Sequence, residues 1–377
     1  MLWAPLPLYC HSRPSTGGWQ PLRFDGGAFH LKGTAELARA LLVLRLCAWP
    51  PLVTHGLAFQ AWSQRLLGSR LSRTLLRGSI YGQFVAGETA AEVKDCVQQL
   101  QALGLQHLLA VPTEEEPDSA AKTSEAWYEG NLSAMLRCVD LSRALVDTRG
   151  PARNSLMQLK MTALTSTQLC KELSAWIQRP AGSSELSPER LADAMDSGQE
   201  THKRLVRDAE AAHKAGLAFG VKLVRGAYLD KERAMTQLQG KEDCTQPDYE
   251  ATSRSYSRCL ELMLRRVSRH GPLCHLMVAS HNEESVLQAT KRMWELGIPP
   301  DGPVCFGQLL GMCDHVSLAL GQAGYVVYKS IPYGCLEEVI PYLIRRAQEN
   351  RSVLQGARRE QALLSQELWR RLLGRKV

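Results

Sequence analysis

The pattern of apolar and polar residues divides the chain into three zones. Residues 1–27 have no regular pattern and form a leader. In residues 28–103, apolar side chains recur at helical spacing, most clearly in Leu57–Leu67 and Ala90–Leu103, which predicts an N-terminal helical region. In residues 104–377 the rhythm changes, because short apolar runs alternate with longer amphipathic stretches.

The third zone predicts a parallel sheet, since this alternation is typical of repeated βα units. Each short run is nearly continuously apolar, as expected for strands that are buried on both faces. The predicted strands are His107–Pro112, Ser155–Thr162, Gly220–Tyr228, His275–Ser280, Val304–Gln308 and Tyr325–Ser330.

Start signals mark several of the helices between these strands. Ser187 followed by Pro188 is typical of a helix start, with serine as the cap and proline at the first helical position. Ser280 and Glu283 have the spacing of a capping box. Predicted helices begin near Asn131 and cover Thr165–Gln178, Glu337–Asn350 and Arg358–Leu373.

Repeated βα units at this length favour an α/β fold, either a (β/α) barrel or a doubly wound sheet. A barrel of the (β/α)8 type closes with eight strands, whereas the sequence pattern predicts six. The gap is local, because Ser183–Lys214 is polar with a helical pattern and contains no strand-like apolar run. If the fold is a barrel, its third and fourth strands are missing.

Composition excludes several classes of protein. With 377 residues, 45% of them hydrophobic, the chain can bury a large core. Its net charge of +7 is modest and spread along the chain, which disfavours nucleic-acid binding. The 11 cysteines are scattered without paired spacing, so free thiols are expected rather than a disulfide framework or a metal site.

The N-terminal part leaves two questions of location open. The apolar stretch Leu37–Trp49 contains arginines and ends at two prolines, so it is not a transmembrane helix. It is a membrane-surface helix or, as amphipathicity favours, a helix packed on the main domain. The first 24 residues contain no acid, which suits a mitochondrial transit segment and equally a short disordered leader.

Candidate catalytic residues are expected at the carboxyl ends of the strands, where the active sites of parallel barrels lie. Lys160 interrupts an apolar strand, and a buried lysine is costly unless it pairs with an anion; alternatively it reaches the rim. Arg345 and Arg346 suit a carboxylate, although Arg345 can instead pair with Glu349 one turn on.

A second set of candidates surrounds the strand that ends at Tyr228. Period-two alternation puts a cation, a small residue, a glycine and an aromatic on one face, which would let a flat ring approach the backbone; an ordinary strand explains them as well. These residues are Lys222, Val224, Gly226 and Tyr228. His281 and Asn282 can cap a helix, and Gln308 can simply end its strand. No Rossmann fingerprint, P-loop or Gly-x-Ser-x-Gly motif is present.

The order of several motifs is more specific than any one of them, and together they resemble the proline dehydrogenase family. The likeness begins near Gly26, reaches the C-terminus, and is strongest to the mitochondrial hydroxyproline dehydrogenases. It rests on Gln83–Glu88, Leu159-Lys160, Lys222–Tyr228, Ala279–Asn282, Phe306–Met312 and Tyr342–Asn350.

This resemblance implies a distorted (β/α)8-type barrel with FAD at its carboxyl face. It implies oxidation of trans-4-hydroxy-L-proline, and more weakly of L-proline, to the pyrroline-5-carboxylate product. Hydride would pass to the flavin and electrons then to ubiquinone. The expected location is the mitochondrial matrix side, with peripheral association with the inner membrane.

The resemblance also implies roles for individual residues. The substrate carboxylate would be held by Lys160, Arg345 and Arg346, and Tyr228 would pack beside the substrate ring. Ser330 stands where proline-preferring members have a tyrosine, and a serine leaves room for a 4-hydroxyl group. The flavin would be lined by Lys222, Val224, Gly226, His281, Asn282 and Gln308.

The chain departs from the family between the Lys160 and Lys222 strands, where two strands are missing. Asp208-Ala209-Glu210 looks like a family motif but lies in a helical stretch, and the junction falls near Gln199. An active dehydrogenase and a catalytically silent, internally deleted relative that binds FAD poorly are therefore both open. A methylenetetrahydrofolate reductase-like flavin barrel explains the architecture but not Tyr342–Asn350.

Overall fold

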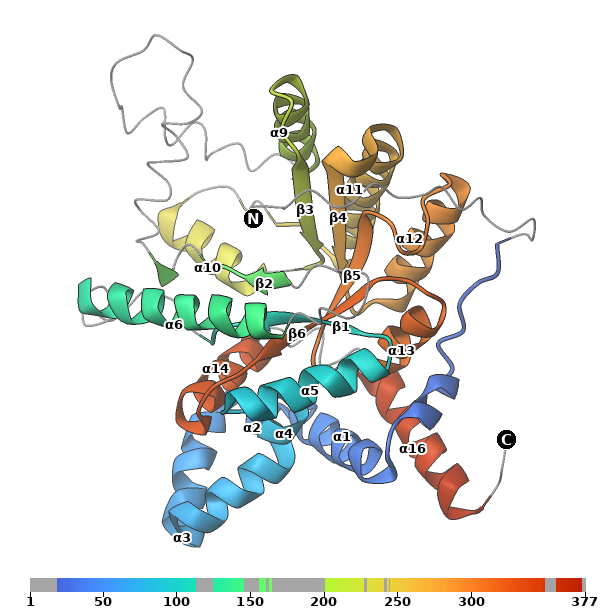
Figure 1. Ribbon diagram of the computed structural model, residues 1–377. Helices are drawn as coiled ribbons and strands as arrows, with labels where there is room; N and C mark the ends of the chain where they lie inside the picture. Colours follow the sequence, from blue (N-terminus) through green and yellow to red (C-terminus); the bar gives the residue numbers. More distant parts are fainter. Residues whose placement is uncertain are drawn as a thin grey trace.

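The centre of the molecule is a single parallel sheet of six strands (Figure 1). The computed structural model describes residues 19–112, 125–145, 156–160, 163–164, 201–226, 229–240, 243, 245–349 and 357–374. The strands are β1 (Gln106–Ala110), β2 (Leu156–Gln158), β3 (Phe219–Val224), β4 (Cys274–Ala279), β5 (Val304–Leu309) and β6 (Val327–Pro332).

The strand order shows where the sheet is open. It runs β2-β1-β6-β5-β4-β3, so the two edge strands, β2 and β3, follow one another in sequence. This is the order of a (β/α) barrel cut between β2 and β3, and the sheet curls into a half-barrel (Figure 1). Among the described residues no strand joins these two edges. The expected α/β fold is confirmed, whereas the expected gap stays a prediction because most residues between β2 and β3 lie outside the described part of the chain.

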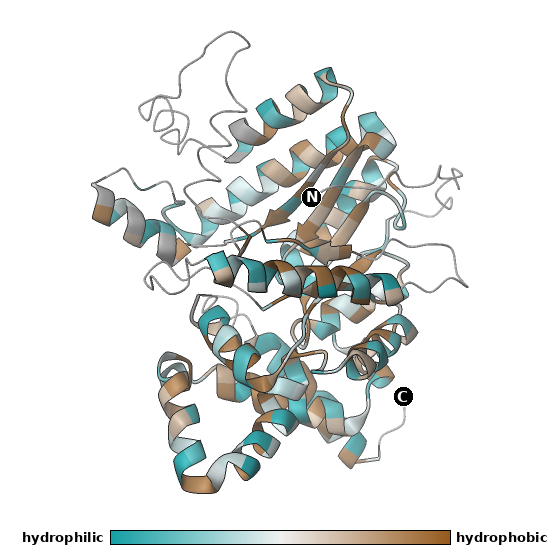
Figure 2. Cartoon of the chain, turned by 60° about the vertical axis from the view of Figure 1, so that its left-hand side comes forward, coloured by the Kyte–Doolittle hydropathy of each residue, from teal (hydrophilic) through white to brown (hydrophobic). Residues whose placement is uncertain are grey.

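The two faces of the sheet differ because side chains alternate along each strand. One face packs against the helices through residues such as Val278, Phe306 and Val327, all fully buried. The other, inner face carries a small separate cluster of Leu108, Met277, Cys305 and Tyr328. Figure 2 shows the strands as the most continuously hydrophobic segments and the helices as mixed.

Helices cover the outer face and the N-terminal side. Before the first strand lie the short η1 (Gly27–Leu31), α1 (Thr34–Cys47), α2 (Pro50–Thr54), α3 (Gly56–Leu76), the π-helical η2 (Arg77–Tyr81), α4 (Gly82–Phe84) and α5 (Ala90–Ala102). The remainder are α6 (Glu125–Ala144), α9 (Thr201–Lys214), α10 (Leu229–Gln239), α11 (Tyr249–His270), η5 (Gly271–Leu273), α12 (Glu283–Glu295), α13 (Asp314–Gln322), α14 (Leu336–Glu349) and α16 (Arg358–Leu372).

Local signals explain several helix boundaries. Thr89 and Glu92 form a capping box that starts α5. The α12 cap is Asn282, whose side chain accepts from the Ser285 N–H, so the expected cap at Ser280 is wrong. Ser280 instead accepts from the Asn282 N–H. The predicted helix near Asn131 is α6 and begins earlier, at Glu125.

Strand lengths and burial differ from the expectation at the edges. β3 ends at Val224 rather than Tyr228, because Gly226 has a φ of 66° that an extended strand cannot hold. β2 and β3 are only partly buried, since each pairs on one side only with another described strand. The predicted helices at Thr165–Gln178 and after Ser187 lie outside the described residues.

The N-terminal helices resolve one of the open alternatives. α1, which contains most of Leu37–Trp49, packs on α16 and buries Leu37, Val43 and Leu44. No described helix is long and apolar enough to cross a membrane. The cysteines whose state the structure gives are all free, as expected.

Candidate active site at the carboxyl edge of the sheet

The Gln83–Glu88 segment lies over the carboxyl ends of β5 and β6. The Ala86 N–H donates to the Pro332 carbonyl over 2.9 Å, and the Gln83 side-chain amide donates to the Gly311 carbonyl over 2.8 Å. Gly311 has a φ of 74°, and a Cβ there would stand 2.2 Å from the Gln83 carbonyl oxygen. Only glycine allows this approach, so the segment holds the β5–α13 turn in place.

Two of the predicted carboxylate-binding residues meet at an aromatic ring. The Lys160 Nζ lies 4.9 Å from the centre of the Tyr342 ring, and the Arg346 guanidinium carbon lies 5.9 Å from the same centre. Lys160 follows β2, whereas the other two belong to α14, so the contact brings an edge of the sheet to the helix after β6. We call Lys160, Tyr342 and Arg346 the cation–tyrosine cluster. Arg345, the preceding residue, is half-buried.

Ser330 faces the inner side of the sheet at the same edge. It pairs in register with Leu309 of β5 and Leu108 of β1. It comes two residues after Tyr328 of the inner cluster, so both side chains lie on the same face. The side chain is half-buried, and Leu309 beside it is 40% exposed. A small polar group next to an accessible apolar one therefore lines the inner face.

Lys222 is the candidate whose positive charge most clearly calls for an anionic partner. It pairs in register with Met277 of the inner cluster and is half-buried, and burial lowers the pKa of its ammonium group. Among the described residues no carboxylate lies within ion-pair distance of it. A bound anion would restore the lost solvation.

Val224 and Gly226 lie at the open end of β3. Val224 is 47% exposed, and no atom lies within 4 Å of a Cβ built on Gly226. The space beside this backbone fits the approach of a flat ring. The strand ends at Val224, so Gly226 lies beyond it. Tyr228 lies outside the described residues.

His281 and Asn282 follow β4. The Leu309 N–H donates to His281 Nε2 over 3.1 Å, and burial lowers the pKa of the imidazole to about 3, with Lys329 adding to the effect. The ring is therefore neutral, with Nδ1 as the N–H donor. Asn282, besides capping α12, donates from its amide to the Tyr249 hydroxyl over 2.9 Å.

Gln308 lies away from this group. It alternates with Leu309 along β5 and is only 3% exposed. Its amide oxygen accepts from the Ser317 hydroxyl of α13, and its amide nitrogen lies 3.4 Å from the Ser280 carbonyl oxygen. Its hydrogen bonds are thus directed into the helical layer.

Sequence reasoning missed a buried charge cluster beneath the site. Lys329 is 1% exposed, and its ammonium donates to Asp314 over 2.8 Å and to the Leu309 and Met312 carbonyls. Lys32 contacts the other Asp314 oxygen at 2.5 Å. Burial would raise the pKa of Asp314, but the two ammonium groups outweigh it and hold this pKa well below its usual range. Lys329, like Lys160, is a lysine within a predicted apolar strand, so the same signal was present in its sequence context.

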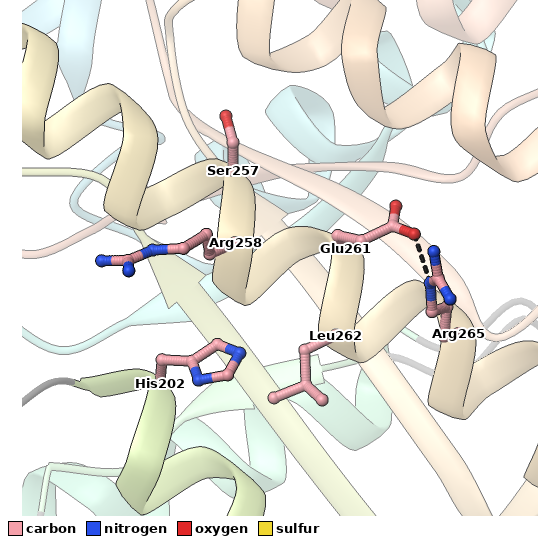
Figure 3. A pocket seen from close by; sticks show the side chains of 6 residues that line it. All are labelled: His202, Ser257, Arg258, Glu261, Leu262 and Arg265. Carbon is pink, nitrogen blue, oxygen red and sulfur yellow. Dashed lines mark hydrogen bonds and ion pairs between the residues drawn. The ribbon is translucent and has the colours of Figure 1, made fainter.

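One hollow of the described surface lies away from this edge. It is an open groove of about 440 Å³ between α9 and α11 (Figure 3). Its lining is His202, Ser257, Arg258, Glu261, Leu262 and Arg265. Glu261 is already bonded to Arg265 and Arg292, so the groove offers no unpaired acid. The described residues contain no metal-binding group of His, Cys, Asp or Glu.

Comparison with known proteins assigns the family. The chain is 74% identical over 454 aligned positions to a hydroxyproline dehydrogenase of Mus musculus, with both chains fully covered. This chain belongs to the proline dehydrogenase family. The family pattern described as proline dehydrogenase matches residues 198–359, and the mitochondrial proline dehydrogenase 1 of Homo sapiens is 30% identical over 92% of this chain.

Solved structures of the family agree on the fold. Proline utilization A from Bdellovibrio bacteriovorus superposes with a TM-score of 0.60 at 18% identity. The match covers 89% of this chain and 40% of that longer one. The dehydrogenase-type barrel predicted from the motifs is therefore confirmed as the fold of this family member.

The alignment to the mouse relative also bears on the missing strands. It spans 454 positions, whereas this chain has 377 residues, which leaves 77 positions without a counterpart here. The open edges of the sheet lie at β2 and β3. The expected internal deletion stays a prediction, because most residues between these two strands lie outside the described part of the chain.

Proposed function

We propose that the chain oxidises trans-4-hydroxy-L-proline, and more weakly L-proline, to the pyrroline-5-carboxylate product with bound FAD. The observation that carries this proposal is the cation–tyrosine cluster beside an inner face lined by Ser330. Lys160 and Arg346 offer positive charge to a carboxylate, and the Tyr342 ring offers an apolar surface to a pyrrolidine ring. Ser330 adds a hydroxyl that can bond a 4-hydroxyl group.

The side chains near β3 have the charge and hydrogen-bonding groups that suit an anionic flavin. Lys222 is a half-buried cation without a described carboxylate partner, and His281 presents an N–H donor. Together with the backbone near Gly226, and with Val224 and Asn282, they would hold FAD, which supplies the hydride acceptor when bound. The Gln308 hydrogen bonds favour a role in supporting the β5–α13 turn rather than direct flavin contact.

The chain's own contribution to the reaction is positioning. Lys160, Arg345 and Arg346 would fix the substrate carboxylate and so orient the pyrrolidine ring within the site. Tyr342 keeps this clamp in shape because both cations rest on its ring. Tyr228 is proposed to pack beside the substrate. Ser330 distinguishes a hydroxylated ring from an unsubstituted one, since a polar site loses binding when its partner is missing.

Ubiquinone is the proposed electron acceptor, and the proposed location is the matrix side of the inner mitochondrial membrane. The name of the human proline dehydrogenase 1 relative supports a mitochondrial location.

The alternative function, a catalytically silent relative, is favoured by one observation. β2 and β3 are open edges, and the flavin-side residues Lys222 and Val224 lie on one of them. Among the described residues, no further strand covers this side of the proposed flavin site.

Visible absorbance of the purified chain, before and after anaerobic trans-4-hydroxy-L-proline, decides between the two. Flavin bands that bleach support the dehydrogenase, and a colourless protein that takes up no added FAD supports the silent form. In an active protein, Lys160→Met should raise KM by about ten- to a hundredfold, from the loss of a charged contact. Lys291→Met, at a lysine whose side chain is 58% exposed, is the matched control. An unchanged KM in Lys160→Met would remove the carboxylate clamp from the proposal.

A further inference from the structure

Helix α3 forms a projecting hairpin rather than one straight rod. Gly68 has φ 75° and ψ 159°, which splits Gly56–Leu76 into two arms. The arms meet through the Ser63 and Ser72 hydroxyls, 2.8 Å apart. Figure 1 shows this hairpin reaching away from the sheet and the other helices. We call Gly56–Leu76 the α3 hairpin.

The α3 hairpin buries polar side chains and exposes large apolar ones. Its buried contact is a pair of serines, with Ser72 only 2% exposed, whereas Trp62 and Leu66 are 60% and 61% exposed. The exposed apolar side chains come from both arms and from the turn before Gly68, and they include Leu57, Trp62, Leu66, Leu67, Leu71 and Leu75. Figure 2 shows hydrophobic segments along the hairpin. Six large apolar side chains exposed on one projecting element mark a contact that water does not satisfy.

The charge around this surface has one sign. From Leu37 to Gly87 the sequence contains no aspartate or glutamate. Arg65 and Arg70 lie on the α3 hairpin, and among the described residues no carboxylate pairs with either. Arg73 does pair, with Glu337 of α14. Two arginines without a described carboxylate partner lie among exposed tryptophan and leucine side chains. This combination is complementary to a layer that has anionic groups at its surface and an apolar interior.

We propose that the α3 hairpin docks on an anionic lipid bilayer, with its apolar side chains in the interface and Arg65 and Arg70 at the headgroup phosphates. No described helix can span a membrane, so the contact is peripheral. A bilayer fits better than a groove on another protein, because the apolar residues lie on both arms and at the tip instead of forming one stripe. The proposal deepens the membrane association proposed above and rests on it.

The base of the hairpin places the bilayer near the candidate active site. Gly56 packs against Ile344 of α14, since a Cβ there would meet the Ile344 side chain at 3.0 Å. α14 also carries Tyr342 and Arg346. The docked enzyme would therefore hold its substrate-binding helix close to the membrane, where a lipid-soluble electron acceptor is found.

Co-flotation of the full chain with vesicles tests the surface without turnover. The probes are phosphatidylcholine vesicles with and without phosphatidylglycerol. Wild type should float with the anionic vesicles, and Trp62→Glu/Leu66→Glu should reduce the bound fraction about tenfold or more, since each large apolar side chain contributes at least that factor. Trp369→Glu is the matched control, because Trp369 is 64% exposed on α16. Arg65→Ser/Arg70→Ser should reduce binding to anionic vesicles only, and salt should mimic it.

Far-UV circular dichroism confirms that each variant is folded, so a loss of flotation reports on the surface. The proposal is overturned if wild type floats with neither vesicle, or if the tip variant floats like Trp369→Glu. It is also overturned if the tip variant changes only the oligomeric state on a sizing column, which would make the hairpin a contact between copies. A colourless chain that floats on anionic vesicles contradicts the proposed function and leaves the docking surface standing.

Discussion

Removal of the Asp314 carboxylate should show how much the buried Asp314–Lys329 ion pair stabilises the carboxyl edge of the sheet. The Lys329 ammonium is almost completely buried, and Asp314 is its one described carboxylate partner, at 2.8 Å. Asp314→Ala leaves this ammonium with only the carbonyls of Leu309 and Met312. Those two carbonyls belong to the turn beneath the candidate site, so the stability of the turn depends on the pair.

The size of the effect follows from burial. Breaking a buried ion pair by removing one partner costs about 3–5 kcal/mol of unfolding free energy, because a charge remains without compensation. Lys32 contributes less, since its side chain is 19% exposed and can turn to water. In a Lys329→Met background the buried charge is gone, so Asp314→Ala should cost about 1–3 kcal/mol less there.

Urea unfolding followed by tryptophan fluorescence measures these free energies. The control is Asp208→Ala on α9, whose side chain is 53% exposed and pairs with Arg207 at the surface. It should change stability by no more than about 0.5 kcal/mol. The reasoning is refuted if Asp314→Ala costs under about 1 kcal/mol, or if it costs the same with and without Lys329.

Three further outcomes follow from the same part of the molecule. The folded pKa of Asp314 lies below its ordinary 3.8, so its contribution to stability is complete above that value and is lost as pH falls further; Asp314→Ala should flatten acid unfolding below about pH 4. Gly311→Ala should destabilise by roughly 2 kcal/mol more than Gly216→Ala by urea unfolding, because both have positive φ but only the first meets the Gln83 carbonyl. Lys222→Met should stabilise the flavin-free chain slightly and weaken uptake of added FAD, measured by flavin fluorescence.

Sequence reasoning found the strands because each is a short apolar run between turn signals. It also predicted a gap before β3, because no such run lies in the polar stretch there, and this gap stays a prediction. It could not give the burial of β2 and β3, which depends on neighbouring elements rather than on their own residues. It also extended β3 through Gly226, where the positive φ is a property of the folded backbone.

The candidate site was predictable mainly through the order of its motifs. Lys160 and Arg346 were proposed as partners, and the structure brings them to one ring. Tyr342 lay within a quoted motif, yet only the folded chain places it between the two cations. Gln308 shows the opposite case, because the motif named the residue but not the face to which its side chain turns.

The strand order divides the candidate site into two arcs, and this division bears on what the open edges of the described sheet change. The proposed carboxylate-binding residues follow β2 or lie on α14, which follows β6, whereas most proposed flavin-side residues lie on β3 or just after β3 and β4. Between these arcs β5 and β6 remain paired, in register from Phe306–Val327 to Leu309–Ser330, so the arcs keep their relative position on that side. The open edges remove the second connection, which a closed barrel would supply. Substrate recognition should therefore depend less than flavin affinity on these open edges.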